Sequence, residues 1–173
     1  MADASVPAGK GIRFLEAGQY DEAARSFLAA RLIDPDSPDL AFNLGLARLR
    51  DGRARDARKA FEEARALGGE NADLLCNLGL ALFELGKAEE ARAHYERALE
   101  LEPDHPEAGN NLGVALFSTG HFDEAREYFS RAARARPDYY DAWFNLRDTC
   151  AELGLEAERT VAQIELDRLE GHA

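Results

Sequence analysis

The strongest constraint on this 173-residue chain is a pattern that recurs every 34 residues in a single register. Five windows span residues 4–37, 38–71, 72–105, 106–139 and 140–173. Small and aromatic residues mark equivalent positions of successive windows: Gly11, Gly45, Gly79 and Gly113; Gly18, Gly52, Gly86, Gly120 and Gly154; Ala23, Ala57, Ala91 and Ala125; Phe27, Phe61, Tyr95 and Phe129. A period of this length indicates stacked supersecondary units, none of which buries its apolar face alone.

Each window has the pattern of a helical hairpin, as the third one illustrates. Leu75, Leu78 and Leu82 recur at spacings of three and four, which places them on one face of a helix. Gly86 then stands where a left-handed residue ends a helix. A second amphipathic helix follows and ends before Pro103. We name these helix A and helix B of a window.

The small residues predict how the two helices pack. We expect Gly79 on helix A and Ala91 on helix B to let the two backbones approach closely, because neither carries a large side chain. Tyr95 is then placed to fill the space toward neighbouring helices.

The fifth window loses this pattern in its second half, where Arg159 and Gln163 replace an alanine and an aromatic residue. Terminal repeats are commonly atypical, since nothing stacks beyond them. We therefore expect 156–170 to form a solvating cap helix with Val161, Ile164 and Leu169 facing inward. Its outward residues are predicted to be Glu158, Glu165, Asp167 and Arg168.

The motifs resemble those of the tetratricopeptide repeat family. Trp143-x-x-Leu146 matches the opening of the family pattern, and Ala125-x-x-x-Phe129 followed by Pro137 matches its close. The resemblance covers essentially the whole chain. It implies an all-α fold, an α-solenoid of stacked antiparallel hairpins in a right-handed superhelix, forming one domain over 1–173. It also implies that the A helices line a concave groove for a protein or peptide partner.

An amide recurs at the sixth position of four windows: Asn43, Asn77, Asn111 and Asn145. An amide side chain donates and accepts hydrogen bonds, so such a ladder can hold the main chain of an extended peptide. It is similar to the asparagine ladder of O-linked N-acetylglucosamine transferases. The alternative is that these amides help neighbouring A helices to pack.

Apolar side chains flank the amides along the predicted groove: Phe42, Leu46, Leu80, Phe83, Val114, Phe117 and Phe144. A contiguous exposed apolar patch usually marks a binding site. The alternative for Leu49, Phe83 and Phe117 is that they lean into the contact with the next helix. Four amide contacts at about 0.5–1.5 kcal/mol each fall short of the roughly 8 kcal/mol of a micromolar complex. The ligand is therefore expected to carry apolar anchors.

The second position of the same windows is acidic, with Asp39, Asp73, Glu107 and Asp141. This acidic rim would attract Lys or Arg of a ligand. Alternatively, each acid stabilises the positive end of its helix. Chaperone-binding repeat domains need lysines at the second and fifth positions, which this chain lacks, so acidic chaperone tails are not expected partners.

Window two departs from the others in two respects. It has Gly69 where other windows have proline, which predicts a looser junction with window three. It also concentrates positive charge in Arg50, Arg53, Arg55, Arg58 and Lys59. We interpret this basic cluster as a solvated outer face, or alternatively as a second contact for an acidic partner.

Charge and composition exclude several other functions. The net charge of −12 disfavours nucleic acid and anionic membrane surfaces. No apolar run approaches the ~18 residues of a membrane span, and no secretory signal begins the chain, so a cytoplasmic location is expected. Cys76 and Cys150 are too few for a disulfide framework. No spacing of histidine, cysteine or carboxylate predicts a metal, a cofactor or catalysis.

Three hypotheses for the function follow. The first is a non-enzymatic adaptor that binds an apolar peptide segment, flanked by basic residues, in its groove. The second is a scaffold that assembles into homo-oligomers through its terminal helices or its groove. The third is an enzyme or an enzyme's regulatory module.

Overall fold

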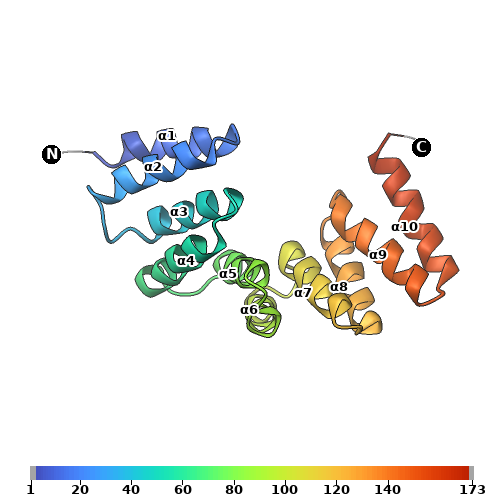
Figure 1. Ribbon diagram of the computed structural model, residues 1–173. Coiled ribbons are helices and arrows are strands. Elements are labelled where there is room, and N and C mark those ends of the chain that lie inside the picture. The colour runs from blue at the N-terminus through green and yellow to red at the C-terminus, as the bar shows by residue number, and fades with distance from the viewer. Residues whose placement is uncertain (1–2, 172–173) are drawn as a thin grey trace. The chain divides into compact units, whose positions relative to one another are not determined.

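The computed structural model describes residues 3–171, and over this range the chain forms ten α-helices and no strand (Figure 1). In chain order they are α1 (Ser5–Glu16), α2 (Tyr20–Arg31), α3 (Pro38–Arg50), α4 (Ala54–Gly68), α5 (Ala72–Glu84), α6 (Ala88–Leu101), α7 (Pro106–Ser118), α8 (Phe122–Ala135), α9 (Tyr140–Glu152) and α10 (Glu156–Leu169). The predicted all-α class, with two helices per window, is confirmed.

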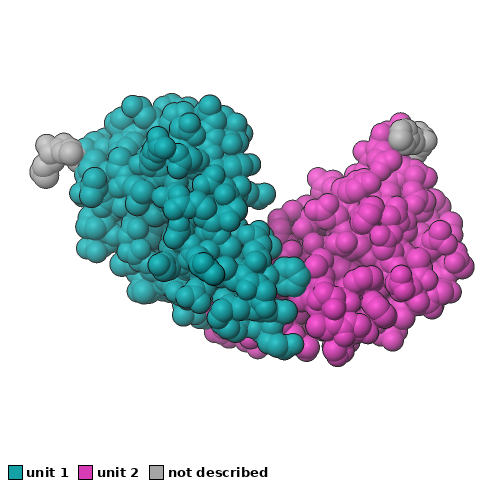
Figure 2. Space-filling view, viewed as in Figure 1, with its two compact units in different colours: residues 1–91 teal, residues 92–173 magenta. Residues whose placement is uncertain are grey.

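The chain divides into two compact units, residues 1–91 and residues 92–173, with the boundary inside α6 (Figure 2). Unit 1 contains α1–α5 and unit 2 contains α7–α10. Within unit 1 the hairpins are α1–α2 and α3–α4, and within unit 2 they are α7–α8 and α9–α10. The single domain predicted over 1–173 stays a prediction, and its first two and last two residues lie outside the described part.

The A helices of neighbouring hairpins contact one another directly within each unit, α1 with α3, α3 with α5, and α7 with α9. The backbones of the B helices stay farther apart, and long side chains bridge them. Arg31 of α2 pairs with Glu63 of α4, and Arg126 of α8 pairs with Glu158 of α10 at 2.8 Å. The side of each stack that the A helices form, which we call the A side, is therefore its narrow side, as expected for the inner side of a solenoid.

Glycine ends every A helix, as the period predicts. Gly18, Gly52, Gly86, Gly120 and Gly154 have φ values between 69° and 81°. In the described part of the chain, no residue other than glycine has a positive φ. A side chain at these positions would clash with its own backbone, so the hairpin turn requires glycine.

A glycine–aromatic contact joins the two helices in three of the hairpins, α1–α2, α3–α4 and α7–α8. A Cβ atom placed on Gly45 would lie 2.5 Å from the ring of Phe61, and one on Gly113 would lie 2.6 Å from the ring of Phe129. Gly11 meets Phe27 in the same way, at 2.7 Å. The A-helix glycine thus makes room for an aromatic ring of its own hairpin, and the close backbone approach predicted at Gly79 and Ala91 stays a prediction.

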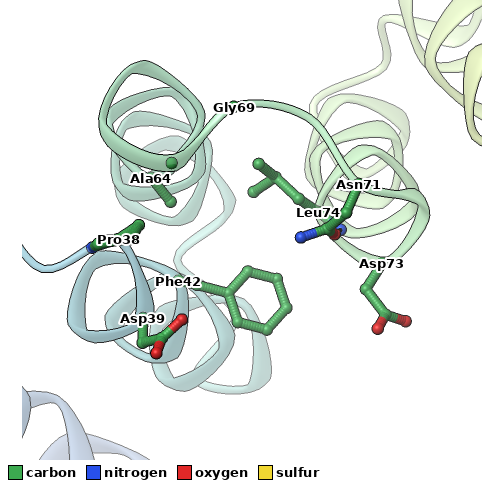
Figure 3. Close-up of a pocket in the computed structure, with 9 residues that line it drawn as sticks. Pro38, Asp39, Phe42, Ala64, Gly69, Asn71, Asp73 and Leu74 are labelled. Carbon is green, nitrogen blue, oxygen red and sulfur yellow. Dashed lines mark hydrogen bonds between the residues drawn. The ribbon is translucent and has the colours of Figure 1, made fainter.

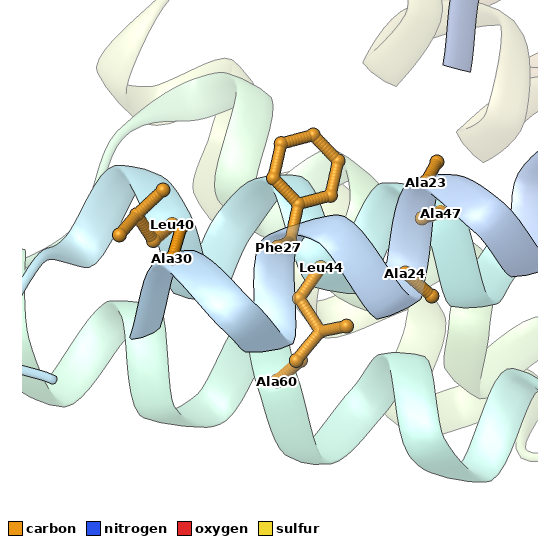
Figure 4. Packing of buried hydrophobic residues seen from close by; sticks show 8 residues of the cluster. All are labelled: Ala23, Ala24, Phe27, Ala30, Leu40, Leu44, Ala47 and Ala60. Atoms are coloured by element: carbon orange, nitrogen blue, oxygen red, sulfur yellow. The ribbon is translucent and has the colours of Figure 1, made fainter. Parts of the chain in front are cut away.

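Small residues complete the core around these rings. Phe27 is fully buried in a cluster with Ala23, Ala30 and Ala47 of the first two hairpins (Figure 4). Phe61 in the α3–α4 hairpin and Phe129 in the α7–α8 hairpin are also almost fully buried. A buried phenylalanine side chain contributes about 1.5–3 kcal/mol. The hairpins that contain Phe27, Phe61 and Phe129 therefore draw much of their stability from one ring and the small residues around it.

The inward face predicted for the last helix is wrong in two of its three residues. Val161 and Ile164 are 55% and 57% exposed, whereas Ala162 and Leu166 are buried and Leu169 is half-buried. The long polar side chains of Arg159 and Gln163 cannot fill the positions that alanine and an aromatic ring hold elsewhere. Leu166 holds the buried position that Ala30, Ala64 and Ala132 hold in earlier windows, and Ala162 completes the buried stripe of α10.

The starts of α3, α5 and α7 follow from their local sequences. Pro38 and Pro106 are the first residues of α3 and α7, a position that suits proline. The preceding residue caps the helix: Ser37 accepts from the Leu40 N–H, Asn71 from the Leu74 N–H and His105 from the Ala108 N–H. These bonds satisfy backbone donors that a helix terminus leaves free.

Replacing Gly45 by alanine tests the glycine–aromatic contact. The added methyl group would overlap the Phe61 ring, and such overpacking costs about 1–3 kcal/mol of unfolding free energy. Gly9→Ala is the matched control, since nothing lies within 4 Å of its Cβ position in α1 and helix propensity favours the change by up to ~1 kcal/mol. Urea denaturation of both variants measures the two effects. Equal stability changes for both would contradict the contact.

Candidate functional site

The A helices of unit 1 place the predicted groove residues on their half-buried side. Phe42, Asn43 and Leu46 of α3 are all half-buried, as are Asn77, Leu80 and Phe83 of α5. The ring centroid of Phe42 lies 5.6 Å from that of the buried Phe61, so the hairpin core fixes its position. Leu49 is 6% exposed, which supports its alternative role in helix packing.

A cavity of about 240 Å³ opens at the junction of α3, α4 and α5 (Figure 3). Phe42 lies at its centre, with Asp39 and Asp73 on either side of the ring (Figure 3). The end of α4 at Gly68 and Gly69 forms another wall. The cavity lies at the junction where Gly69 replaces proline, and it unites two residues of the predicted acidic rim with one of the predicted apolar residues.

The A helices of unit 2 enclose a smaller, more apolar cavity of about 130 Å³. Val114 and Phe117 of α7 line it together with Asn145 of α9, and all three are half-buried. Phe144 is 38% exposed beside it on α9. Each unit thus brings together, on its own A helices, apolar residues and an amide that the sequence predicted for the groove.

The four asparagines do not share one hydrogen-bonding pattern. The amide group of Asn77 donates to the Asp73 carbonyl of its own helix. The amide group of Asn145 donates to Oδ1 of Asn110 at 2.9 Å, which joins α9 to α7. Asn43 and Asn111 are half-buried. These contacts support the helix-packing alternative for the donor groups of Asn77 and Asn145, and the ladder as a peptide grip stays a prediction.

The sequence did not single out three residues that shape this surface in unit 2. Asn110 is 5% exposed and orients the Asn145 amide. Tyr140 stacks on Phe144 with centroids 6.3 Å apart, and the Arg147 guanidinium lies 4.4 Å from the Phe144 centroid. Tyr140 also donates a hydrogen bond to Glu170, which raises the pKa of its hydroxyl. The sequence does contain a signal for Asn110, because the equivalent positions of other windows hold apolar residues such as Phe42 and Phe144.

The acidic rim is not uniform. Asp39, Asp73 and Asp141 are exposed, whereas Glu107 is half-buried and pairs with Arg136, Nη1 to Oε1, at 2.6 Å. Burial raises the pKa of Glu107, but the hydrogen bond from Arg136 and its charge outweigh this and leave the pKa below its ordinary value. Glu107 is thus a carboxylate already bound to a guanidinium of its own chain.

The basic cluster of window two lies around the α3–α4 turn and on α4, as predicted. Arg53 pairs with Asp56 at 2.6 Å, and Arg58 pairs with Glu62 at 3.6 Å. Arg50, Arg55 and Lys59 are exposed. Pairs of this kind are exposed to solvent and contribute little stability.

Other side chains of types that can act in catalysis or bind a metal have structural roles. Cys76 and Cys150 are buried and form no disulfide within residues 3–171, and burial is the main reason that the pKa of Cys150 is raised. Residues 3–171 contain no group of three histidine, cysteine or carboxylate side chains placed to hold a metal ion. Within the same range, every helix is too short or too polar to cross a membrane. His105 caps a helix, and His172 lies outside the described residues.

The comparisons with known proteins agree with this architecture. The tetratricopeptide repeat family matches in four overlapping segments, residues 9–72, 43–106, 76–140 and 110–158. The chain therefore belongs to the tetratricopeptide repeat family, whose members are typically non-catalytic interaction modules that bind proteins or peptides. No curated protein matches the chain significantly.

Solved structures share the fold at low sequence identity. A structure of MamA has a TM-score of 0.76 and 21% identity over 97% of this chain and 92% of that one. PilF of Pseudomonas aeruginosa has a TM-score of 0.85 and 21% identity over 96% and 76% of the two chains. YrrB, described as a TPR protein with an unusual peptide-binding site, has a TM-score of 0.69 and 23% identity over 98% and 87%.

The Glu107–Arg136 pair predicts a specific pH dependence. A carboxylate whose pKa is lowered by folding adds stability above its unfolded pKa, and this stability disappears as the pH falls through the folded pKa. At pH 7, Glu107→Gln should therefore lower the unfolding free energy by up to ~1 kcal/mol. The deficit should begin to shrink as the pH falls below the ordinary value of 4.5 and vanish once the pH is below the folded pKa of Glu107. Asp141→Asn is the control, because Asp141 forms no ion pair within residues 3–171. A deficit that persists at low pH would contradict the pairing.

Proposed function

We propose that this protein is an adaptor whose A helices bind a peptide segment with apolar side chains flanked by basic ones. The observation that carries the proposal is the composition of the A side. In both units it presents half-buried apolar residues next to amides, and a cavity opens between helices. Leu46 and Leu80 in unit 1 and Val114 in unit 2 are the central apolar contacts.

Physical chemistry supports a peptide as the ligand. Half-buried apolar surface gains free energy when a ligand covers it, at about 25 cal/mol per Å². An amide such as that of Asn43 can add main-chain hydrogen bonds that depend little on ligand sequence. The acidic residues Asp39 and Asp73 beside Phe42, and the net charge of −12, favour a ligand with positive charge. A peptide-binding site in YrrB, a protein of the same fold, is consistent with this use.

A peptide selected by display on the immobilised chain tests the proposal. Fluorescence polarisation would compare its affinity for wild type, for Leu80→Glu and for Leu28→Glu. Leu80 lies on the A side, and Leu28 is a 41% exposed residue of α2 that serves as the matched control. We expect Leu80→Glu to weaken binding at least roughly tenfold, since a covered leucine contributes about 1.5–3 kcal/mol. Leu28→Glu should leave the affinity unchanged.

Circular dichroism of both variants establishes that they fold. The proposal fails if folded Leu80→Glu binds as tightly as wild type, or if Leu28→Glu loses as much affinity.

Self-association is a second candidate, and exposed apolar residues on the first and last helices favour it. Val6 and Ile12 of α1 are 60% and 45% exposed, and Val161 and Ile164 of α10 are 55% and 57% exposed. Contact between α1 of one copy and α10 of another would cover both sets. This candidate predicts a mass that rises with concentration in sedimentation velocity, and a monomer for the variant Val161→Glu, Ile164→Glu. A wild-type monomer at every concentration would exclude it.

A further inference from the structure

The cavity of unit 1 has a counterpart two repeats later, where a guanidinium of the chain itself binds the carboxylate. Two periods of 34 residues relate Asp39 to Glu107, Gly68 to Arg136, and Asp73 to Asp141. At the later junction, Nη1 of Arg136 lies 2.6 Å from Oε1 of Glu107. The Arg136 guanidinium also lies 5.2 Å from the centroid of the Tyr139 ring. The later site therefore combines a carboxylate, an aromatic face and a guanidinium.

At the earlier junction the same position is Gly68, so this position supplies no cation. What remains is the 240 Å³ cavity, with the carboxylates of Asp39 and Asp73 flanking the ring of Phe42 (Figure 3). Asp39 is exposed and pairs with no cation within residues 3–171. Gly68 itself packs against Pro38, because a Cβ there would lie 2.7 Å from that of Pro38. Pro38 thus occupies the space that a side chain at position 68 would need.

Two features of the cavity favour positive charge. The carboxylates of Asp39 and Asp73 lie on opposite sides of the Phe42 ring (Figure 3). The negative end of the α4 dipole at Gly68 is offset by the positive ends of α3 and α5, which begin beside the cavity, so the helix dipoles add no net preference. The face of the Phe42 ring attracts a cation through its quadrupole. A planar guanidinium can stack on the ring while its N–H groups reach a carboxylate.

We infer that this cavity binds the guanidinium group of an arginine side chain from the partner peptide. The inference rests on the proposed function, because it names the basic residue that such a peptide would place next to an apolar anchor. The arginine enters from outside at the junction of α3, α4 and α5, and it occupies the site that Arg136 fills from within at the later junction. Asp39 is the principal acceptor, as Glu107 is for Arg136.

A titration with a single capped residue tests the inference without any peptide. Amide shifts of the full chain in ¹H–¹⁵N NMR would be followed with N-acetyl-arginine methylamide, with the lysine analogue and with the citrulline analogue. Citrulline matches the shape of arginine but lacks its charge. We expect saturable shifts at Gly69, Asn71 and Asp73 with the arginine probe. The dissociation constant for citrulline should be at least roughly tenfold higher, as for loss of a charge-assisted hydrogen bond.

Two variants with the same charge change separate the cavity from general electrostatics. Asp39→Asn should weaken the arginine probe by roughly tenfold, whereas Asp141→Asn, at the equivalent second position in unit 2, should leave it unchanged. The spectra themselves report whether each variant is folded. Equal binding of citrulline and arginine, or equal loss in the two variants, would overturn the inference. Lysine binding as tightly as arginine would overturn the guanidinium assignment.

The two proposals fail in different ways. If the arginine probe does not bind but the selected peptide still depends on Leu80, the cavity inference is wrong and the adaptor function stands. If the probe binds at the cavity but no peptide depends on Leu80, the adaptor function is wrong in its present form.

Discussion

In three hairpins an aromatic ring of helix B packs against a glycine of helix A, and the placement of helix A in these hairpins depends on this contact. Gly11, Gly45 and Gly113 each leave space that only a ring of the same hairpin fills. The contact fixes the distance between the two helices and the rotation of helix A about its axis. That rotation determines which residues of helix A lie on the A side, away from helix B. The candidate binding surface is therefore a consequence of how each hairpin is built.

Repetition gives neighbouring junctions the same framework, and single substitutions then give them different chemistry. The α3–α5 junction has Gly68 and an open cavity, whereas the α7–α9 junction has Arg136 bound to Glu107. The backbone plan is shared, because Pro38 and Pro106 begin equivalent helices. A solenoid can thus place a closed, structural ion pair and an open, ligand-accepting site at equivalent positions without changing its fold.

The sequence predicts the features that depend on local chemistry. The 34-residue period, the left-handed glycines such as Gly86 and the prolines that begin α3 and α7 each follow from one residue and its neighbours. Prediction from the sequence fails where a residue distant in the chain determines whether a side chain is buried or which group it pairs with. Val161 and Ile164 were expected to be buried, but the packing of α10 on α9 turned Ala162 and Leu166 inward. Asn110 and Arg136 were missed because their partners, Asn145 and Glu107, lie about one repeat away in sequence.

The central claim is that the A side of the helices, and not the B side, contacts the partner. Site-specific photo-crosslinking of a biotinylated, display-selected peptide tests it most directly. A benzophenone amino acid would replace Leu80 or Val114 on the A side, or Ala66 or Arg134 on the exposed side of α4 or α8. The account predicts crosslinks from the first two positions and none from the other two. Crosslinks of equal yield from all four positions, or from the B helices alone, would contradict it.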